Sequence, residues 1–256
     1  MSALEILGLT LVAATAGAIN AVAGGGTVLT FPTLLFYGTP PVIANATSTL
    51  ALFVGTAGSI FGFRGKMAAV RPWIVRFVPV SLLGGLLGSV LLTRTSNEAF
   101  ARLVPFLILF ATVLFFLQGV FRRLAAFQAK EAAEHGRHLG VAIVFQFLVS
   151  LYGGYFGAGI GILMLASLGF IGFTDIHEMN ALKNLLSSLI NAVATIWFIK
   201  SGLIDWPKAS VMTVGAVAGY YIGAHFSQRI PREAVRGVIT CIGFAISIYT
   251  FWKQFA

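Results

Sequence analysis

Lys183 is a charged residue deep inside a long apolar stretch. Of all residues in the sequence, it most clearly indicates a chemical role. It lies nine residues beyond Thr174, or roughly 13 Å along a helix. A lysine at the centre of a membrane helix costs about 2.5–3.5 kcal/mol. We therefore expect its ammonium either to reach toward the surface or to meet an anion. Further polar side chains recur at helical spacing on the same face: Asn180, Asn184, Ser187 and Asn191. This stripe predicts a substrate or cavity lining, with hydrogen bonding between helices as the alternative.

Two glycine-rich segments could supply backbone donors to the same anion. The first runs from Asn20 through Gly24, Gly25, Gly26 and Thr27 and is followed by Pro32; the second runs from Gly153 through Tyr155 and Gly159 to Gly161. Glycine costs about 1 kcal/mol in a helix interior, so both segments predict broken helices. A break at membrane depth is tolerated where it lines a cavity, and the N-terminus of the following half-helix favours an anion. Close packing of small residues between helices is the competing interpretation.

The helices that follow these segments carry related polar residues. Asn45, Thr47 and Ser48 open one, and Asn180 and Lys183 lie in the other. We predict that Asn45, Asn180 and Thr47 orient the substrate and that Lys183 supplies the charge. A hydroxyl in such a helix can instead bond to its own backbone.

Other chemistry finds little support in the sequence. Asp175, His177 and Glu178 could hold a metal ion, but their position before a helix favours an N-terminal cap. The spacing of Cys and His matches no metal site, and no nucleophile motif or paired intramembrane carboxylates occur. We expect no enzyme activity, no cofactor and no bound metal.

The composition places these residues in a membrane protein. Of 256 residues, 58% are hydrophobic and 10% are charged, whereas globular domains carry about 25% charged residues. The net charge of +9 comes from single basic residues between apolar runs. This pattern is typical of the positive-inside rule rather than of nucleic-acid binding. Cys241 is the only cysteine, which excludes an intrachain disulfide. The first apolar segment lacks a preceding basic residue, so we expect a retained helix rather than a cleaved signal.

Ten apolar runs predict helices, and eight of them have about the 20 residues that a spanning helix needs. The runs are 4–23, 26–37, 42–63, 73–93, 100–121, 139–156, 160–173, 176–199, 208–226 and 234–251. The second and seventh are too short to span alone. We therefore expect an all-α polytopic protein in the bilayer.

An ungapped shift of 135 residues aligns the two halves of the chain. Matched positions include Gly24 with Gly159, Gly26 with Gly161, Asn45 with Asn180, Pro72 with Pro207 and Arg94 with Arg229. Two repeats, 1–121 and 139–256, are predicted on either side of a hydrophilic linker, 122–138. Each has about four spanning helices and one short broken or re-entrant segment.

The basic loops change position between the two halves. In the first half they follow the third run, and in the second half they follow the fourth. If both are cytoplasmic, the halves are inverted; a parallel repeat is the alternative. Inversion requires an odd number of crossings per half, so we expect the short segment to complete a crossing. The linker would be cytoplasmic and both termini would face outward.

The chain resembles the TauE/SafE family of sulfite exporters. The resemblance rests on Asn20 to Gly26, Phe31-Pro32, Asn45 to Ser48 and the second glycine segment, Gly153 to Gly159. It covers essentially the whole chain. Ala158 and Ile160 interrupt the second glycine run, where the family has contiguous glycines. The resemblance implies movement of sulfite or of small organosulfonate and carboxylate anions across the inner membrane.

These observations predict a secondary transporter of small anions that works by alternating access around a midplane site. A proton or sodium ion is a possible coupling ion. A passive anion channel is the alternative, and a membrane assembly partner without flux is a third hypothesis.

Overall fold

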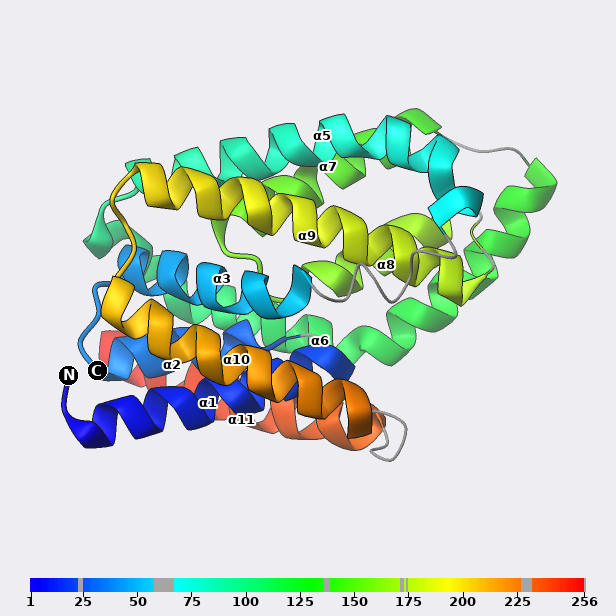
Figure 1. The fold of residues 1–256 in the computed structure, drawn as a ribbon. Helices are drawn as coiled ribbons and strands as arrows, with labels where there is room; N and C mark the ends of the chain where they lie inside the picture. Colours follow the sequence, from blue (N-terminus) through cyan, green and yellow to red (C-terminus); the bar gives the residue numbers. More distant parts are fainter. Residues whose placement is uncertain are drawn as a thin grey trace.

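The computed structural model describes residues 1–22, 25–57, 67–135, 139–170, 173, 175–226 and 232–255, all in helices and short connections (Figure 1). The helices of these ranges are α1 (Ala3–Val22), α2 (Thr27–Phe36), α3 (Pro41–Ala57), α5 (Met67–Arg94), α6 (Asn97–His135), α7 (Leu139–Tyr155), α8 (Ile160–Phe170), α9 (Ile176–Lys200), α10 (Trp206–Phe226) and α11 (Arg232–Phe255). Each of the ten predicted apolar runs overlaps one of them. The all-helical prediction is confirmed for the described ranges.

Helix lengths differ from the expectation of eight spanning helices. Five helices of the described residues are long and apolar enough to cross a membrane, and they lie within α1, α5, α6, α9 and α11. The helices α3 and α7 have 17 residues each. The 21 residues of α10 begin with the polar sequence Trp206-Pro207-Lys208, which lowers its hydropathy. The two short runs are confirmed as short helices, α2 with 10 residues and α8 with 11.

Large apolar side chains cover much of the molecular surface. Phe36 is 82% exposed, Tyr221 78% and Leu4 76%. A soluble protein rarely exposes large contiguous apolar patches. This surface is suited to contact with lipid acyl chains.

Glycines bring two pairs of helices into backbone contact. A methyl group at Gly215 or Gly219 of α10 would collide with the backbone of Thr10 or Ala14 of α1. In the same way, a methyl group at Gly88 of α5 would collide with the α7 backbone. Close approach through small residues is a common way for membrane helices to associate. Thus α1 packs against α10, and α5 packs against α7 (Figure 1).

The short helix α2 turns back beside α1 after the first glycine break. Gly26, just before α2, lies against Ala16 of α1, and Tyr37, just after α2, lies against Gly8 near the start of α1. The two helices are therefore antiparallel, and Figure 1 shows a similar reversal between α7 and α8. The glycine break reverses the chain, and Tyr37 at the end of α2 returns to the level of Gly8. That the short segment completes a crossing stays a prediction. Pro32 lies inside α2 rather than at a break.

The chain ends and the starts of several helices lie at opposite ends of the molecule. Figure 1 shows the N- and C-termini at the same end. The start of α5, the end of α6 and the start of α11 lie at the other end. Helix α6 continues to His135, so most of the predicted linker 122–138 is helical. The proposed repeat boundaries remain a prediction.

Candidate functional site

The first glycine segment forms a capped break between α1 and α2. Gly25 has a φ of +96°, a conformation that favours glycine. The N–H of Gly26 donates to Asn20 Oδ1 over 2.8 Å. Asn20 therefore satisfies one of the free donors at the start of α2, and Thr27 is the first residue of that helix. Gly24 lies outside the described residues.

The second glycine segment forms an equivalent break between α7 and α8. Gly157 and Gly159 have φ values of +81° and +79°. The Tyr152 hydroxyl donates to the Ala158 carbonyl over 2.7 Å and holds the connection in place. The N–H of Gly161, in the first turn of α8, has no acceptor within the parts of the chain that the structure describes. A free donor at this position can bind an anion.

The two breaks meet at Phe115 of α6. The ring of Phe115 occupies the space that a side chain at Gly25 would need. A Cβ at Gly159 would lie 3.8 Å from the same ring and 3.3 Å from Leu114. The N-terminal ends of α2 and α8 therefore approach one another inside the molecule. Sequence analysis did not identify Phe115, because nothing distinguishes it from the other phenylalanines of this apolar run.

Lys183 lies over the start of α8. Its Cδ is 3.4 Å from the position of a Cβ at Gly161, so the lysine side chain packs on this glycine. Its ammonium donates to Asn180 Oδ1 over 3.1 Å. Asn180, Lys183 and Gly161 therefore lie together in the structure. A fixed positive charge thus lies beside the positive end of a half-helix.

Other predicted residues lie around this centre or away from it. Asn45 is buried, and its Nδ2 donates to the Tyr155 carbonyl at the end of α7 over 3.0 Å. Ser48 forms a 2.6 Å hydrogen bond with Thr30 of α2. Thr47 instead accepts the Asp205 N–H at the α9–α10 connection, away from both breaks. Asn184 is half-buried on α9, next to Lys183 in the sequence.

Aromatic side chains pack next to the breaks. Phe31 of α2 contacts Phe156 at a ring-centroid distance of 5.4 Å and Phe100 at 6.1 Å. Phe100 also contacts the ring of Tyr155. Phe31, Phe100 and Phe156 are buried. They link α2, α6 and the second break, a contact that no local sequence pattern predicts.

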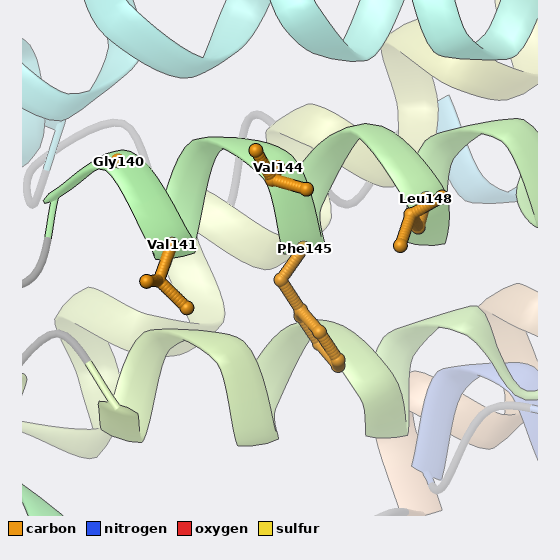
Figure 2. Close-up of a pocket in the computed structure, with 5 residues that line it drawn as sticks. All are labelled: Gly140, Val141, Val144, Phe145 and Leu148. Carbon is orange, nitrogen blue, oxygen red and sulfur yellow. The ribbon is translucent and has the colours of Figure 1, made fainter.

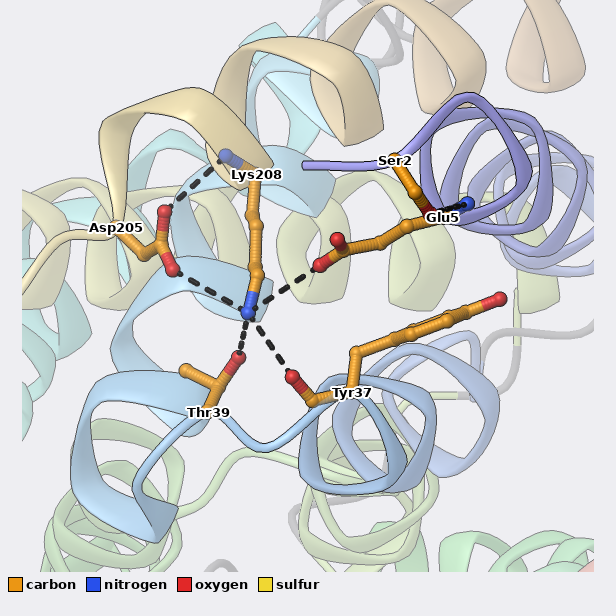
Figure 3. A network of polar contacts seen from close by, with 6 residues as sticks. All are labelled: Ser2, Glu5, Tyr37, Thr39, Asp205 and Lys208. Carbon is orange, nitrogen blue, oxygen red and sulfur yellow. Dashed lines mark hydrogen bonds and ion pairs between the residues drawn. The ribbon is translucent and has the colours of Figure 1, made fainter.

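A charged network joins segments from both halves of the chain (Figure 3). The ammonium of Lys208 donates to Thr39 Oγ1 over 2.8 Å and to the Tyr37 carbonyl over 3.2 Å. It pairs with Glu5 at 3.5 Å and with Asp205 at 3.6 Å. The sequence alone did not identify Lys208 as part of a network. The Asp205-Trp206-Pro207 start of α10, where Asp205 Oδ1 accepts the Lys208 N–H, was the available signal for a helix cap.

A pocket of about 380 Å³ lies on α7, away from the glycine breaks (Figure 2). Its lining is apolar and consists of Gly140, Val141, Val144, Phe145 and Leu148. Val141 and Val144 are largely exposed. The pocket holds no predicted site residue and offers no group that would bind an anion.

Comparisons with known proteins agree with this architecture. The model of the family described as "Sulfite exporter TauE/SafE" matches residues 9–250. A "Probable membrane transporter protein" of Haemophilus influenzae is 29% identical over 92% of this chain and 90% of its own length. The Escherichia coli K12 protein YfcA, named a probable membrane transporter, is 25% identical over 93% of this chain and 87% of its own. YunE of Bacillus subtilis, named in the same way, is 23% identical over 92% of both chains.

No solved structure matches the chain. The family match extends from the first helix to the last and includes both glycine breaks and Lys183. The chain therefore belongs to the TauE/SafE sulfite exporter family and is a multi-pass membrane transporter.

Proposed function

We propose that this protein is a secondary transporter of small anions, with sulfite or an organosulfonate as the substrate. The position of Lys183 over Gly161 at the start of α8 carries the proposal. The ammonium, the first-turn N–H groups of α8 and the Asn180 amide together offer hydrogen-bond donors and one positive charge. A small oxyanion needs such a set, because burying a charge without a partner is strongly unfavourable.

The name of the family supports the choice of substrate. The binding site is then at the midplane, where the starts of α2 and α8 approach Phe115. Discontinuous helices whose N-termini point at anionic groups are common in secondary transporters.

The helix pairing supports two repeats in inverted orientation. By the 135-residue shift, α7 corresponds to α1 and α10 corresponds to α5. The pair α1–α10 is then the counterpart of the pair α7–α5, and both pairs pack through glycines. Each half contributes one member to each pair. Alternating access would rock one half against the other around the central site.

The distribution of charge supports the orientation. Arg71, Arg123 and Arg236 lie on the segments that Figure 1 places at the end opposite the termini. We assign this end to the cytoplasm under the positive-inside rule. Both termini would then face outward across the inner membrane.

Replacement of the central lysine tests the substrate site. Lys183→Met removes the charge and keeps most of the side chain. A hydrogen bond to a charged group contributes about 1.5–3 kcal/mol, so sulfite uptake into proteoliposomes should fall roughly 10- to 100-fold. Lys200→Met, at the exposed end of α9, is the matched control and should keep its flux. Wild-type flux in a folded Lys183→Met protein would remove this lysine from the site.

A passive anion channel is the second candidate, because the same donors could line a pore. The two differ in their energetics. A transporter accumulates the anion against its own electrochemical gradient when a coupling-ion gradient is imposed, and a channel does not. Absence of flux for every anion, together with no thermal stabilisation by any of them, would favour a non-transporting assembly partner.

Cysteine labelling tests the inverted repeat. Lys66→Cys precedes α5, and Lys200→Cys ends α9, so the two should react with an impermeant reagent from opposite sides of the membrane. Cys241 is exposed and must first be replaced by serine. Labelling of both positions from one side would contradict the inversion.

A further inference from the structure

The side-chain oxygen of Asn45 is a buried acceptor without a hydrogen-bond donor. Asn45 is 1% exposed, and its Nδ2 donates to the Tyr155 carbonyl. This bond fixes which end of the amide is the oxygen, because a carbonyl can only accept. Asn45 Oδ1 has no hydrogen-bond partner in the described part of the chain. Leaving a buried acceptor unpaired is unfavourable because the lost hydration is not replaced, so a positively polarised partner is expected at this atom.

The side chain of Asn45 contacts the last turn of α7. The Tyr152 carbonyl accepts the N–H groups of Phe156 and Gly157. The carbonyls of Gly153 and Gly154 accept no hydrogen bond from outside α7 within the described ranges. The C-terminal end of a helix also carries a partial negative charge. The side chain that carries Asn45 Oδ1 thus contacts this carbonyl-rich helix end through its Nδ2, and carbonyl oxygens favour a cation.

The equivalent asparagine in the second half already binds a cation. Asn180 corresponds to Asn45 in the 135-residue shift, and its Oδ1 accepts a hydrogen bond from the Lys183 ammonium over 3.1 Å. Three residues after Asn45 the chain has Ser48 in place of the lysine, and Ser48 is bound to Thr30. One half thus supplies a tethered cation to its asparagine oxygen, and the other half has a neutral side chain engaged elsewhere.

We propose that Asn45 Oδ1 and the C-terminal carbonyls of α7 bind a sodium ion that is coupled to transport. The coupling rests on the proposed transporter function, while binding of the ion itself does not. Sodium sites in transporters use unwound backbone carbonyls and the C-terminal ends of half-helices. Amide and carbonyl oxygens do not take up a proton near neutral pH, so this site selects a metal cation over a proton.

Thermal unfolding of the purified protein, without any substrate anion, tests the site. We compare sodium chloride with potassium chloride and choline chloride at equal concentration. A ligand that binds the folded state raises Tm in a saturable way. Sodium should raise the Tm of the wild type more than potassium or choline does. Asn45→Leu removes the oxygen and should abolish the sodium-specific shift. Asn45→Asp keeps an oxygen and adds a charge, so its shift should saturate at a lower sodium concentration.

Gln146→Leu is the matched control. Gln146 is also a buried amide whose Oε1 lacks a partner among the described residues, but its Nε2 donates to Ser81 and Ser150 between α5 and α7. Its loss should leave the sodium response intact. A wild type without a sodium-specific shift would overturn the proposal, and so would a shift that persists in Asn45→Leu. If Asn45→Leu does not fold, an Asn45→Asp response equal to that of the wild type contradicts the site.

The transport assay separates this proposal from the proposed function. Sulfite flux with a normal Lys183 dependence but no sodium-specific Tm shift would refute the sodium site alone. A sodium-specific shift that depends on Asn45, without flux of any anion, would support the ion site and refute the anion transporter.

Discussion

At the residue scale, glycines determine where the chain can reverse and what can approach the breaks. Gly25 has a positive φ, and its missing side chain leaves room for the ring of Phe115. A Cβ at Gly161 would lie 3.4 Å from Lys183 Cδ, which is ordinary van der Waals contact. The lack of a Cβ is therefore required at Gly25 and is not required by Lys183 at Gly161.

A pair of glycine substitutions distinguishes the effect of backbone strain on stability from the effect of a steric clash with Phe115. Gly25→Ala imposes a strained backbone conformation, which costs about 1–3 kcal/mol, and places a methyl group in the ring of Phe115. Gly38→Ala has a similar φ of +76° but nothing within 4 Å of the added carbon. Gly25→Ala should therefore lower Tm more than Gly38→Ala. Equal shifts in thermal unfolding would show that the contact with Phe115 contributes nothing.

At the element scale, the pairing of α1 with α10 and of α5 with α7 positions both breaks. The glycines of α10 allow its backbone to contact that of α1. The reversal of the chain after α1 then places the start of α2 in the interior, near the start of α8. A half-helix in this position needs partners for its end groups, which Asn20 supplies for α2.

A methyl group at the helix contact tests this pairing. Gly219→Ala puts the methyl group against the Ala14 carbonyl, so α1 and α10 must move apart. Overpacking of this kind costs about 1–3 kcal/mol, and Tm should fall. Gly237→Ala on α11 has nothing within 4 Å and should raise helix stability, by about 1 kcal/mol. A Gly219→Ala protein with unchanged Tm would contradict backbone contact between the two helices.

At the scale of the whole molecule, the network around Lys208 ties the two halves together at the end that holds the termini. Glu5 and Thr39 belong to the first half, and Asp205 and Lys208 belong to the second (Figure 3). The side chain of Lys208 is 12% exposed, so its ion pairs are partly shielded from water. By the 135-residue shift its counterpart is Trp73, which packs on Phe77. The equivalent positions in the two halves therefore make different interactions: Lys208 forms ion pairs and hydrogen bonds, whereas Trp73 packs on an aromatic ring.

Removal of this ammonium should loosen the end that holds the termini. Lys208→Met removes the ammonium donor that four oxygen acceptors share. It also leaves the carboxylates of Glu5 and Asp205 without the positive charge between them. The loss of hydrogen bonds to a charged group amounts to about 1.5–3 kcal/mol. We expect a lower Tm for Lys208→Met than for Glu5→Gln, which removes only one partner. The reverse order in thermal unfolding would show that the Glu5 contact dominates the network.

The sequence by itself determined the helical membrane class, the ten apolar runs and the two glycine breaks. It also singled out Lys183, because a charge within an apolar helix is costly wherever that helix packs. Composition and spacing carry this information locally. Pairwise hydrogen bonding was less predictable: Asn45 and Thr47 lie close together on α3, yet one reaches the end of α7 and the other the start of α10.

Only the tertiary structure decided that α2 turns back, that both breaks approach Phe115 and that Lys183 covers Gly161. It also revealed the role of Lys208 and the unpaired oxygen of Asn45. These features join residues far apart in the chain, and many of them are aromatic or small residues that are common throughout an apolar sequence. Their meaning depends on which helices pack together, and that choice follows from the close approach of whole helices rather than from any local pattern.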